Sequence, residues 1–162
     1  MNKLLVKDSI VNIKDSLCNL DIKTSDLTLI ISGNVCINDY DNNSDLNLKI
    51  LMEKSSHLLY NRYNEDIRKF NLDIELTNAS FVEFNYSLKT NGESNITLNA
   101  NVAGDDNVSR INFHGVTDNE GVIKNIATSK VDEKTQNNEV LENLRIITLN
   151  DAENMIVPNL LV

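Results

Sequence analysis

The chain lacks tryptophan and has one proline, five glycines and two cysteines among its 162 residues. Two cysteines are too few for a disulfide framework, and the glycines form neither Gly-x-Gly-x-x-Gly nor Gly-x-x-x-x-Gly-Lys. Their spacing therefore disfavours an intrinsic ATPase. No Gly-x-Ser-x-Gly elbow for nucleophilic catalysis occurs either. Because no apolar stretch has the length or flanks of a membrane span or signal peptide, we expect a cytoplasmic protein.

Basic residues are scarce as well, with 15 Lys and Arg against 24 Asp and Glu, which gives a net charge of -9. A charge of this sign repels phosphate backbones and anionic lipid surfaces, so nucleic acid and membrane are excluded as expected partners. With 41% hydrophobic and 24% charged residues, the composition is that of a globular protein. The length fits one domain, which we expect to span residues 1-162.

Asparagine is the residue in clear excess, with 27 copies in the chain. Asparagine tolerates left-handed backbone conformations and favours turns, so it can replace glycine where the chain changes direction. The composition therefore indicates a fold with many corners.

Strict alternation of apolar and polar residues is the clearest pattern, and it runs from Asn71 to Gly115. Successive side chains of a strand point to opposite faces, so this pattern predicts a sheet with one buried and one solvent-facing side. Strands are expected within this stretch at residues 71–76, 82–88, 95–102 and 110–114.

Other short strands are predicted along the chain, separated by polar turn residues. They cover residues 4–6, 10–13, 17–22, 27–32, 35–40, 46–52, 121–131, 144–149 and 156–162, with a polar connection at residues 132–143. Between His57 and Phe70 we favour a strand pair with a turn at residues 61–66, and a short helix is the alternative.

Strand starts recur every 10 to 14 residues or so without intervening helices, which suits a sandwich or a solenoid with two strands and two corners per coil of roughly 20 to 28 residues. The solenoid is favoured because Asn91-Gly92 is the only Asn-Gly hairpin signal. Outward Asn and Thr residues could also form ladders between stacked coils. A stack of coils leaves open ends, and we expect one end to be capped or to meet another chain.

Candidate metal ligands are Cys18, Cys36, His57 and His114, but none of them are close enough in sequence to form a paired ligand motif. Cys18 alternates in phase with Leu20 and Ile22, so we predict a core position for it. His114 alternates in phase with polar residues and is expected on the solvent-facing side. No catalytic or cofactor-binding residue is assigned.

Two groups of acidic residues resemble known kinds of site. The run 39–45 resembles the start of a calcium loop, but Ser44 stands where the sharp turn needs glycine and Ile50 where a bidentate Glu is needed. A solvated turn is the simpler interpretation. Carboxylate pairs of the kind used by glycosidases occur at Asp73 and Glu75, Asp105 and Asp106, and Asp132 and Glu133. Each is more simply a solvated face or turn.

The last third of the chain resembles the core domain of the SufB/SufD family, the scaffold components of the Suf iron-sulfur cluster assembly system. Residues 104–116 resemble a strand pair of that family ending in a Gly-Val corner, and residues 121–126 resemble the next coil. Residues 144–161 are the best match, with an apolar strand, an acidic turn containing alanine and an Ile-x-Pro-x-Leu strand that holds Pro158. The resemblance implies an all-β fold, a single-stranded right-handed parallel β-helix.

The resemblance also sets the functional expectation: a non-enzymatic scaffold acting through protein-protein contacts. It implies a SufC-like ATPase or another SufB/SufD-like chain as partner, or a second copy of this chain, with iron or an iron-sulfur cluster as cargo. In the family, the proline strand leads into a histidine-containing segment and ATPase-docking helices. No residue here matches those segments, so none receives a family role. The alternative is a carbohydrate-active or carbohydrate-binding β-solenoid.

Overall fold

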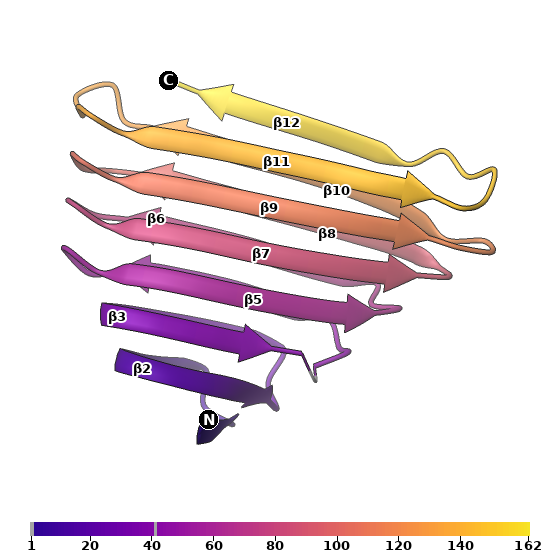
Figure 1. Ribbon diagram of the computed structural model, residues 1–162, viewed down its shortest axis with the longest axis horizontal. Coiled ribbons are helices and arrows are strands. Elements are labelled where there is room, and N and C mark those ends of the chain that lie inside the picture. The colour runs from indigo at the N-terminus through magenta and orange to yellow at the C-terminus, as the bar shows by residue number, and fades with distance from the viewer. Residues whose placement is uncertain (1, 41) are drawn as a thin grey trace.

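The computed structural model describes residues 2–40 and 42–162, and these residues form twelve β-strands and no helix (Figure 1). None of the described residues therefore belongs to a helix that could cross a membrane. The strands are β1 (Asn2–Val6), β2 (Ile10–Ile22), β3 (Asp26–Asp39), β4 (Leu46–Met52), β5 (His57–Glu65), β6 (Lys69–Leu76), β7 (Phe81–Thr90), β8 (Glu93–Val102), β9 (Val108–Thr117), β10 (Val122–Val131), β11 (Glu139–Thr148) and β12 (Met155–Leu161).

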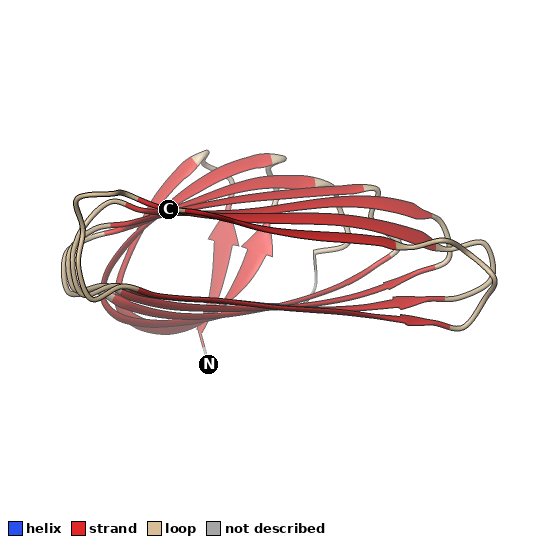
Figure 2. Ribbon diagram, turned by 90° about the horizontal axis from the view of Figure 1, so that it is seen from above, coloured by secondary structure: helices blue, strands red, loops and turns tan. Residues whose placement is uncertain are grey.

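The strands wind into a right-handed parallel β-helix, as predicted (Figure 1). Every strand pair among the described residues is parallel, and from β3 onward each strand pairs with the one two places later. The result is two facing sheets joined by corners (Figure 2). We call them the odd sheet (β5, β7, β9, β11) and the even sheet (β4, β6, β8, β10, β12). The long strand β3 pairs with β4 through its first half and with β5 through its second.

The core fills the space between the sheets, and over residues 71–115 its apolar members are the ones that alternation assigned to the buried side. Five aromatic rings stack through its centre along successive coils, with ring centroids 4.9 to 6.5 Å apart. They belong to Tyr60, Phe70, Phe84, Tyr86 and Phe113, all fully buried. Aliphatic side chains occupy most of the remaining inward positions.

Corner residues connect each coil to the next. Ser55, Ala79, Asp106 and Asn137 share one corner and all have positive φ, between 57° and 59°. Backbone bonds link them, for example from Ala79 N to Asp105 O at 2.8 Å. Asparagine was expected at these left-handed positions, and the prediction is right only in part, because Ser55, Ala79 and Asp106 occupy three of the four. The corner asparagines more often accept hydrogen bonds, as when Asn78 Oδ1 accepts from Asp105 N at 3.0 Å.

A ladder of asparagines runs up the outer face of the odd sheet, confirming the predicted stacking of polar residues. Each amide nitrogen donates to the amide oxygen one coil earlier, at 3.5, 3.0, 3.1 and 2.8 Å in turn. The ladder consists of Asn19, Asn38, Asn61, Asn85 and Asn112. The separations between its members are 19, 23, 24 and 27 residues, so the coils widen toward the C-terminal end. Figure 1 shows the same widening.

Three predicted boundaries were wrong. Residues 10–22 and 26–39 each form one strand that bends at Asp15 (φ 40°) or Gly33 (φ 70°) and passes through both sheets. The turn predicted at residues 61–66 lies after Glu65, and residues 57–70 are strand and turn without helix. The polar connection predicted at residues 132–143 ends early, because β11 starts at Glu139. The backbone of β9 supplies hydrogen-bond partners to β11 whatever the polarity of its side chains.

Candidate functional site

The last coil, formed by β11 and β12, is the place where the core meets solvent. Inward-facing Val140, Leu144, Ile146 and Ile156 are only partly buried, and Leu160 is 61% exposed. The N-terminal coil is better covered, because its inward-facing Val6, Ile13, Leu20 and Ile22 are each 6% exposed or less. Two inward-facing residues at that end are less covered: Val11 is half-buried and Leu4 is 36% exposed. A narrow coil needs few side chains to fill it, whereas the widest coil exposes its interior.

The direction of the backbone groups determines what this coil offers a partner. Outward-facing residues point their N–H to the previous coil, as from Val108 N to Ser80 O and from Glu139 N to Asn107 O, both 2.9 Å. Inward-facing residues point theirs to the next coil, as from Ile123 N to Asn154 Oδ1 at 2.7 Å. Parallel strands alternate in this way along their length. On the last coil, the inward-facing residues therefore direct their N–H groups to the unpaired edge.

Pro158 breaks this row of donors on β12. It pairs with Ala127 of β10 and faces inward, so its nitrogen lies toward the unpaired edge and the ladder with β10 keeps its bonds. On β11 the inward residues are Val140, Glu142, Leu144, Ile146 and Thr148, and every one has an N–H. Among the described strands, β11 thus has an uninterrupted edge, whereas β12 has one that proline blunts.

Glu142 is the charged side chain that points inward on this coil. It lies between Val140 and Leu144, is partly buried, and accepts a hydrogen bond from Ser129 Oγ at 2.6 Å. Ser129 comes from the facing sheet, so this bond crosses the interior just below the open coil. A carboxylate in such a position keeps part of its hydration only while the free edge of the last coil stays uncovered.

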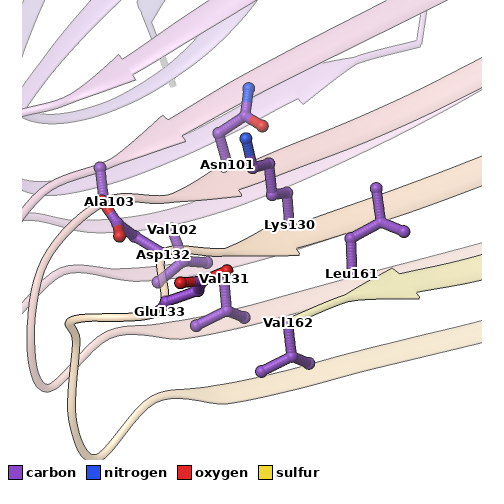
Figure 3. A pocket seen from close by; sticks show the side chains of 9 residues that line it. All are labelled: Asn101, Val102, Ala103, Lys130, Val131, Asp132, Glu133, Leu161 and Val162. Atoms are coloured by element: carbon purple, nitrogen blue, oxygen red, sulfur yellow. The ribbon is translucent and has the colours of Figure 1, made fainter.

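A hollow of about 550 Å³ adjoins the last coil where β8, β10 and β12 end. Asn101, Lys130 and Leu161 form one row across the three strands, and Figure 3 shows them on the same side of the sheet. Asp132 and Glu133 line the other part of the hollow (Figure 3). The lining mixes both charge signs with apolar side chains, and it extends the exposed surface of the open coil.

The chain matches no family model, no curated protein and no solved structure. Its function is therefore argued from the geometry of its own residues.

A buried ion pair inside the lower coils is a second polar feature. Arg62 pairs with Asp39, both side chains are inaccessible to solvent, and Tyr60 donates to Asp39 at 3.0 Å. The Arg62 guanidinium also lies 4.6 Å from the centre of the Phe70 ring. Burial works to lower the pKa of Arg62, but Asp39, Tyr60 and Tyr86 together outweigh it and the pKa is raised. Burial, followed by the charge of Asp39, raises the pKa of Tyr60 well above its usual value.

Residues 39–45, the run that resembles the start of a calcium loop, include one partner of this ion pair and pack around it. Asn42 reaches into the interior, where it donates to Asp39 and its own carbonyl accepts from Arg62 and Asn64. Asp45 Oδ1 accepts from the backbone N–H groups of Arg68 and Lys69, both at 2.9 Å. Asp41 lies outside the described residues. These oxygens therefore bind protein donors, and the run forms a structural corner.

The predicted metal candidates do not come together. Cys18 is buried, as predicted, while its neighbour strand presents Cys36 to the outside. His114 is exposed, as predicted, and His57 packs on Phe81 with ring centroids 5.8 Å apart. No group of three His, Cys, Asp or Glu suitable for a metal occurs in the described part of the chain. Two thiols on opposite sides of a strand pair do not fit an iron-sulfur cluster.

Two of the three carboxylate pairs are engaged in contacts between coils, whereas Asp132 accepts from the nearby Lys134 N at 3.4 Å. Glu75 pairs with Lys49 at 2.6 Å, and Asp73 accepts from Asn99 at 2.8 Å. Asp105 accepts from Gln136 N at 2.7 Å.

Sequence reasoning missed Arg62 and Glu142. The alternation held the signal for both, since each shares the phase of buried neighbours on its strand.

Proposed function

We propose that this chain is a non-enzymatic scaffold component of the SufB/SufD kind, which works in the cytoplasm by binding another protein at its last coil. The observation that carries the proposal is the partial exposure of the inward-facing side chains of β11 and β12. The parallel β-helix agrees with the resemblance of residues 104–161 to that family. The partner would be a SufC-like ATPase or another SufB/SufD-like chain.

The mechanism is assembly on a preformed edge. A partner that covers the last coil removes the apolar side chains from water and bonds to the free N–H groups of β11. Because the coils below are already ordered, little conformational entropy is lost on this side of the interface. No chemical step on iron or a cluster is assigned to this chain, since its thiols point apart.

The test is co-expression of the tagged chain with its genomic neighbours, followed by mass spectrometry of what co-elutes. We expect a SufC-like or SufB/SufD-like protein in a defined ratio. The variant Ile146→Asp places a charge on the open coil and should abolish co-elution. Leu59→Asp, on the outer face of the odd sheet, is the matched control and should retain it. The proposal fails if the chain elutes alone, or if Ile146→Asp keeps the partner.

A second candidate, a carbohydrate-binding β-solenoid, has one observation in its favour. Tyr40 and Tyr63 are exposed on the outer face of the odd sheet, and the Tyr63 hydroxyl donates to Glu65. Aromatic faces beside a carboxylate suit sugar rings. Binding to an oligosaccharide array that Tyr63→Ala abolishes would favour this function, and absence of binding would exclude it.

A further inference from the structure

We infer that a strand from a different protein adds to the free edge of β11 and carries a lysine or arginine opposite Glu142. The inference rests on the proposed function, contact at the last coil, and names the strand that is used and the chemistry of its partner. It follows from three features of that coil: the direction of the N–H groups, the position of Pro158 and the charge of Glu142.

The edge itself selects β11 over β12. An added strand bonds to the N–H and C=O groups of the inward-facing residues, and β11 offers five such residues in succession, from Val140 to Thr148. On β12, the central one of the inward residues is Pro158, which has no N–H. A strand placed there would leave an acceptor unpaired, so the odd sheet is the one extended.

The carboxylate of Glu142 sets the chemistry of the partner. Glu142 faces inward, so an added strand would cover it as β11 covers Ile111 below it. Its hydrogen bond from Ser129 leaves the negative charge uncompensated. A carboxylate that becomes buried needs a cation or a proton, and the side chain opposite it on the added strand is the nearest position from which a cation can reach it. The net charge of -9 favours a basic partner as well.

A second copy of this chain does not provide that cation. If β11 of another copy paired with this edge, Glu142 would face one of its inward residues, which are Val140, Glu142, Leu144, Ile146 and Thr148, and none of them is basic. Arg145 of β11 faces outward. If β1 of another copy paired instead, its inward residues Leu4 and Val6 are apolar, and its 5 residues would leave half of the 10-residue edge of β11 uncovered. Charge and length therefore both point to a different protein.

The experiment uses the whole chain and end-blocked ten-residue peptides with the sequence of β11. The peptides carry Glu142→Lys, Glu142→Leu or no change, and their dissociation constants are measured by fluorescence anisotropy. We expect the lysine peptide to bind about tenfold more tightly than the leucine peptide, and the unchanged peptide most weakly, because a buried charge pair stabilises binding while two carboxylates repel. In the protein variant Glu142→Leu, the lysine peptide should lose its advantage and the leucine peptide should bind best.

Two further variants locate the edge. Leu144→Pro removes a free N–H from β11 as Pro158 does from β12, so it should abolish peptide binding; Ile146→Pro repeats the test at the next position. Circular dichroism verifies that each variant is folded. Equal binding of the three peptides, an unchanged order with Glu142→Leu, or full binding to both folded proline variants would overturn the inference. Loss of the co-eluting partner would overturn the proposed function instead, so the two failures are distinguishable.

Discussion

Removing Arg62 is expected to be one of the most damaging single changes in the chain. The substitution Arg62→Met keeps much of the side-chain volume, but it leaves the Asp39 carboxylate buried with only the Tyr60 hydroxyl and the Asn42 amide as partners. It also removes the guanidinium from the face of Phe70. Breaking a buried pair from one side costs about 3 to 5 kcal/mol. The free energy of unfolding of a domain is roughly 5 to 15 kcal/mol, so this loss would be a large part of the total.

The double variant Arg62→Met with Asp39→Leu separates the pair from the cost of an unpaired charge. Replacing both partners by apolar groups removes the buried charges together, so the double variant should be more stable than Arg62→Met alone. The free energy of unfolding is measured by urea titration with circular dichroism. Lys49→Met, which breaks the exposed pair with Glu75, is the control and should leave the urea midpoint nearly unchanged.

The reasoning is refuted if Arg62→Met unfolds at the same urea concentration as the unchanged protein. It is also refuted if the double variant loses as much stability as the sum of the two single variants. Either result would mean that Arg62 and Asp39 are hydrated or do not interact in the folded chain.

Three other predictions follow from backbone and burial. Leu144→Pro should lower the free energy of unfolding only through the packing of one half-buried side chain. Arg145→Pro removes an N–H that bonds to β9, leaves its acceptor unpaired and should cost about 1 to 3 kcal/mol more by urea titration; equal losses would contradict the assigned N–H directions. Ala79→Gly should raise stability by about 1 kcal/mol, since Ala79 has a φ of 58°, and a lower thermal midpoint would contradict this. Burial raises the pKa of Tyr60 and Tyr86. The contribution of each phenol to the free energy of unfolding is therefore complete below about pH 10, and above that pH it falls by about 1.4 kcal/mol per pH unit. In an alkaline titration followed by tyrosinate absorbance, these two phenols should ionise only as the chain unfolds; ionisation before unfolding would show that they are hydrated.

The solenoid could be predicted because its core obeys a period of two over almost the whole chain. Alternation between Asn71 and Gly115 placed the inward apolar residues of its four strands correctly, and the paucity of hairpin signals favoured coils over a sandwich. Buried Thr90, Ser94 and Ser109 in the same stretch were not predicted. The breaks predicted between residues 13 and 17 and between residues 32 and 35 coincide with real bends at Asp15 and Gly33, but each strand continues through its bend. Pairing resumes directly beyond each bend, after a register shift at the first and a change of partner strand at the second, and no local pattern shows this. The length of each coil depends on which strands stack, which is information that no local pattern contains.

The candidate site was predicted less well. The fold class predicted that a coil end would be open. That the last coil exposes its inward side chains follows from the widening of the coils, which the sequence pattern did not show. Glu142 has the phase of a core residue in a segment that was expected to be a loop, so its alternation was passed over. Pro158 was noticed as part of a family resemblance, whereas its physical role depends on which way its nitrogen faces, and that requires the register with β10.

The widening of the coils also bears on how the chain acquires its structure during synthesis. Each strand contacts the coil before it, 19 residues back near the start and 27 further along, so every coil finds its template already complete when it leaves the ribosome. The narrow coils close over the shortest loops and lose the least entropy, which makes them the natural nucleus. We expect folding to proceed vectorially from that nucleus, with each new coil slower to close than the last.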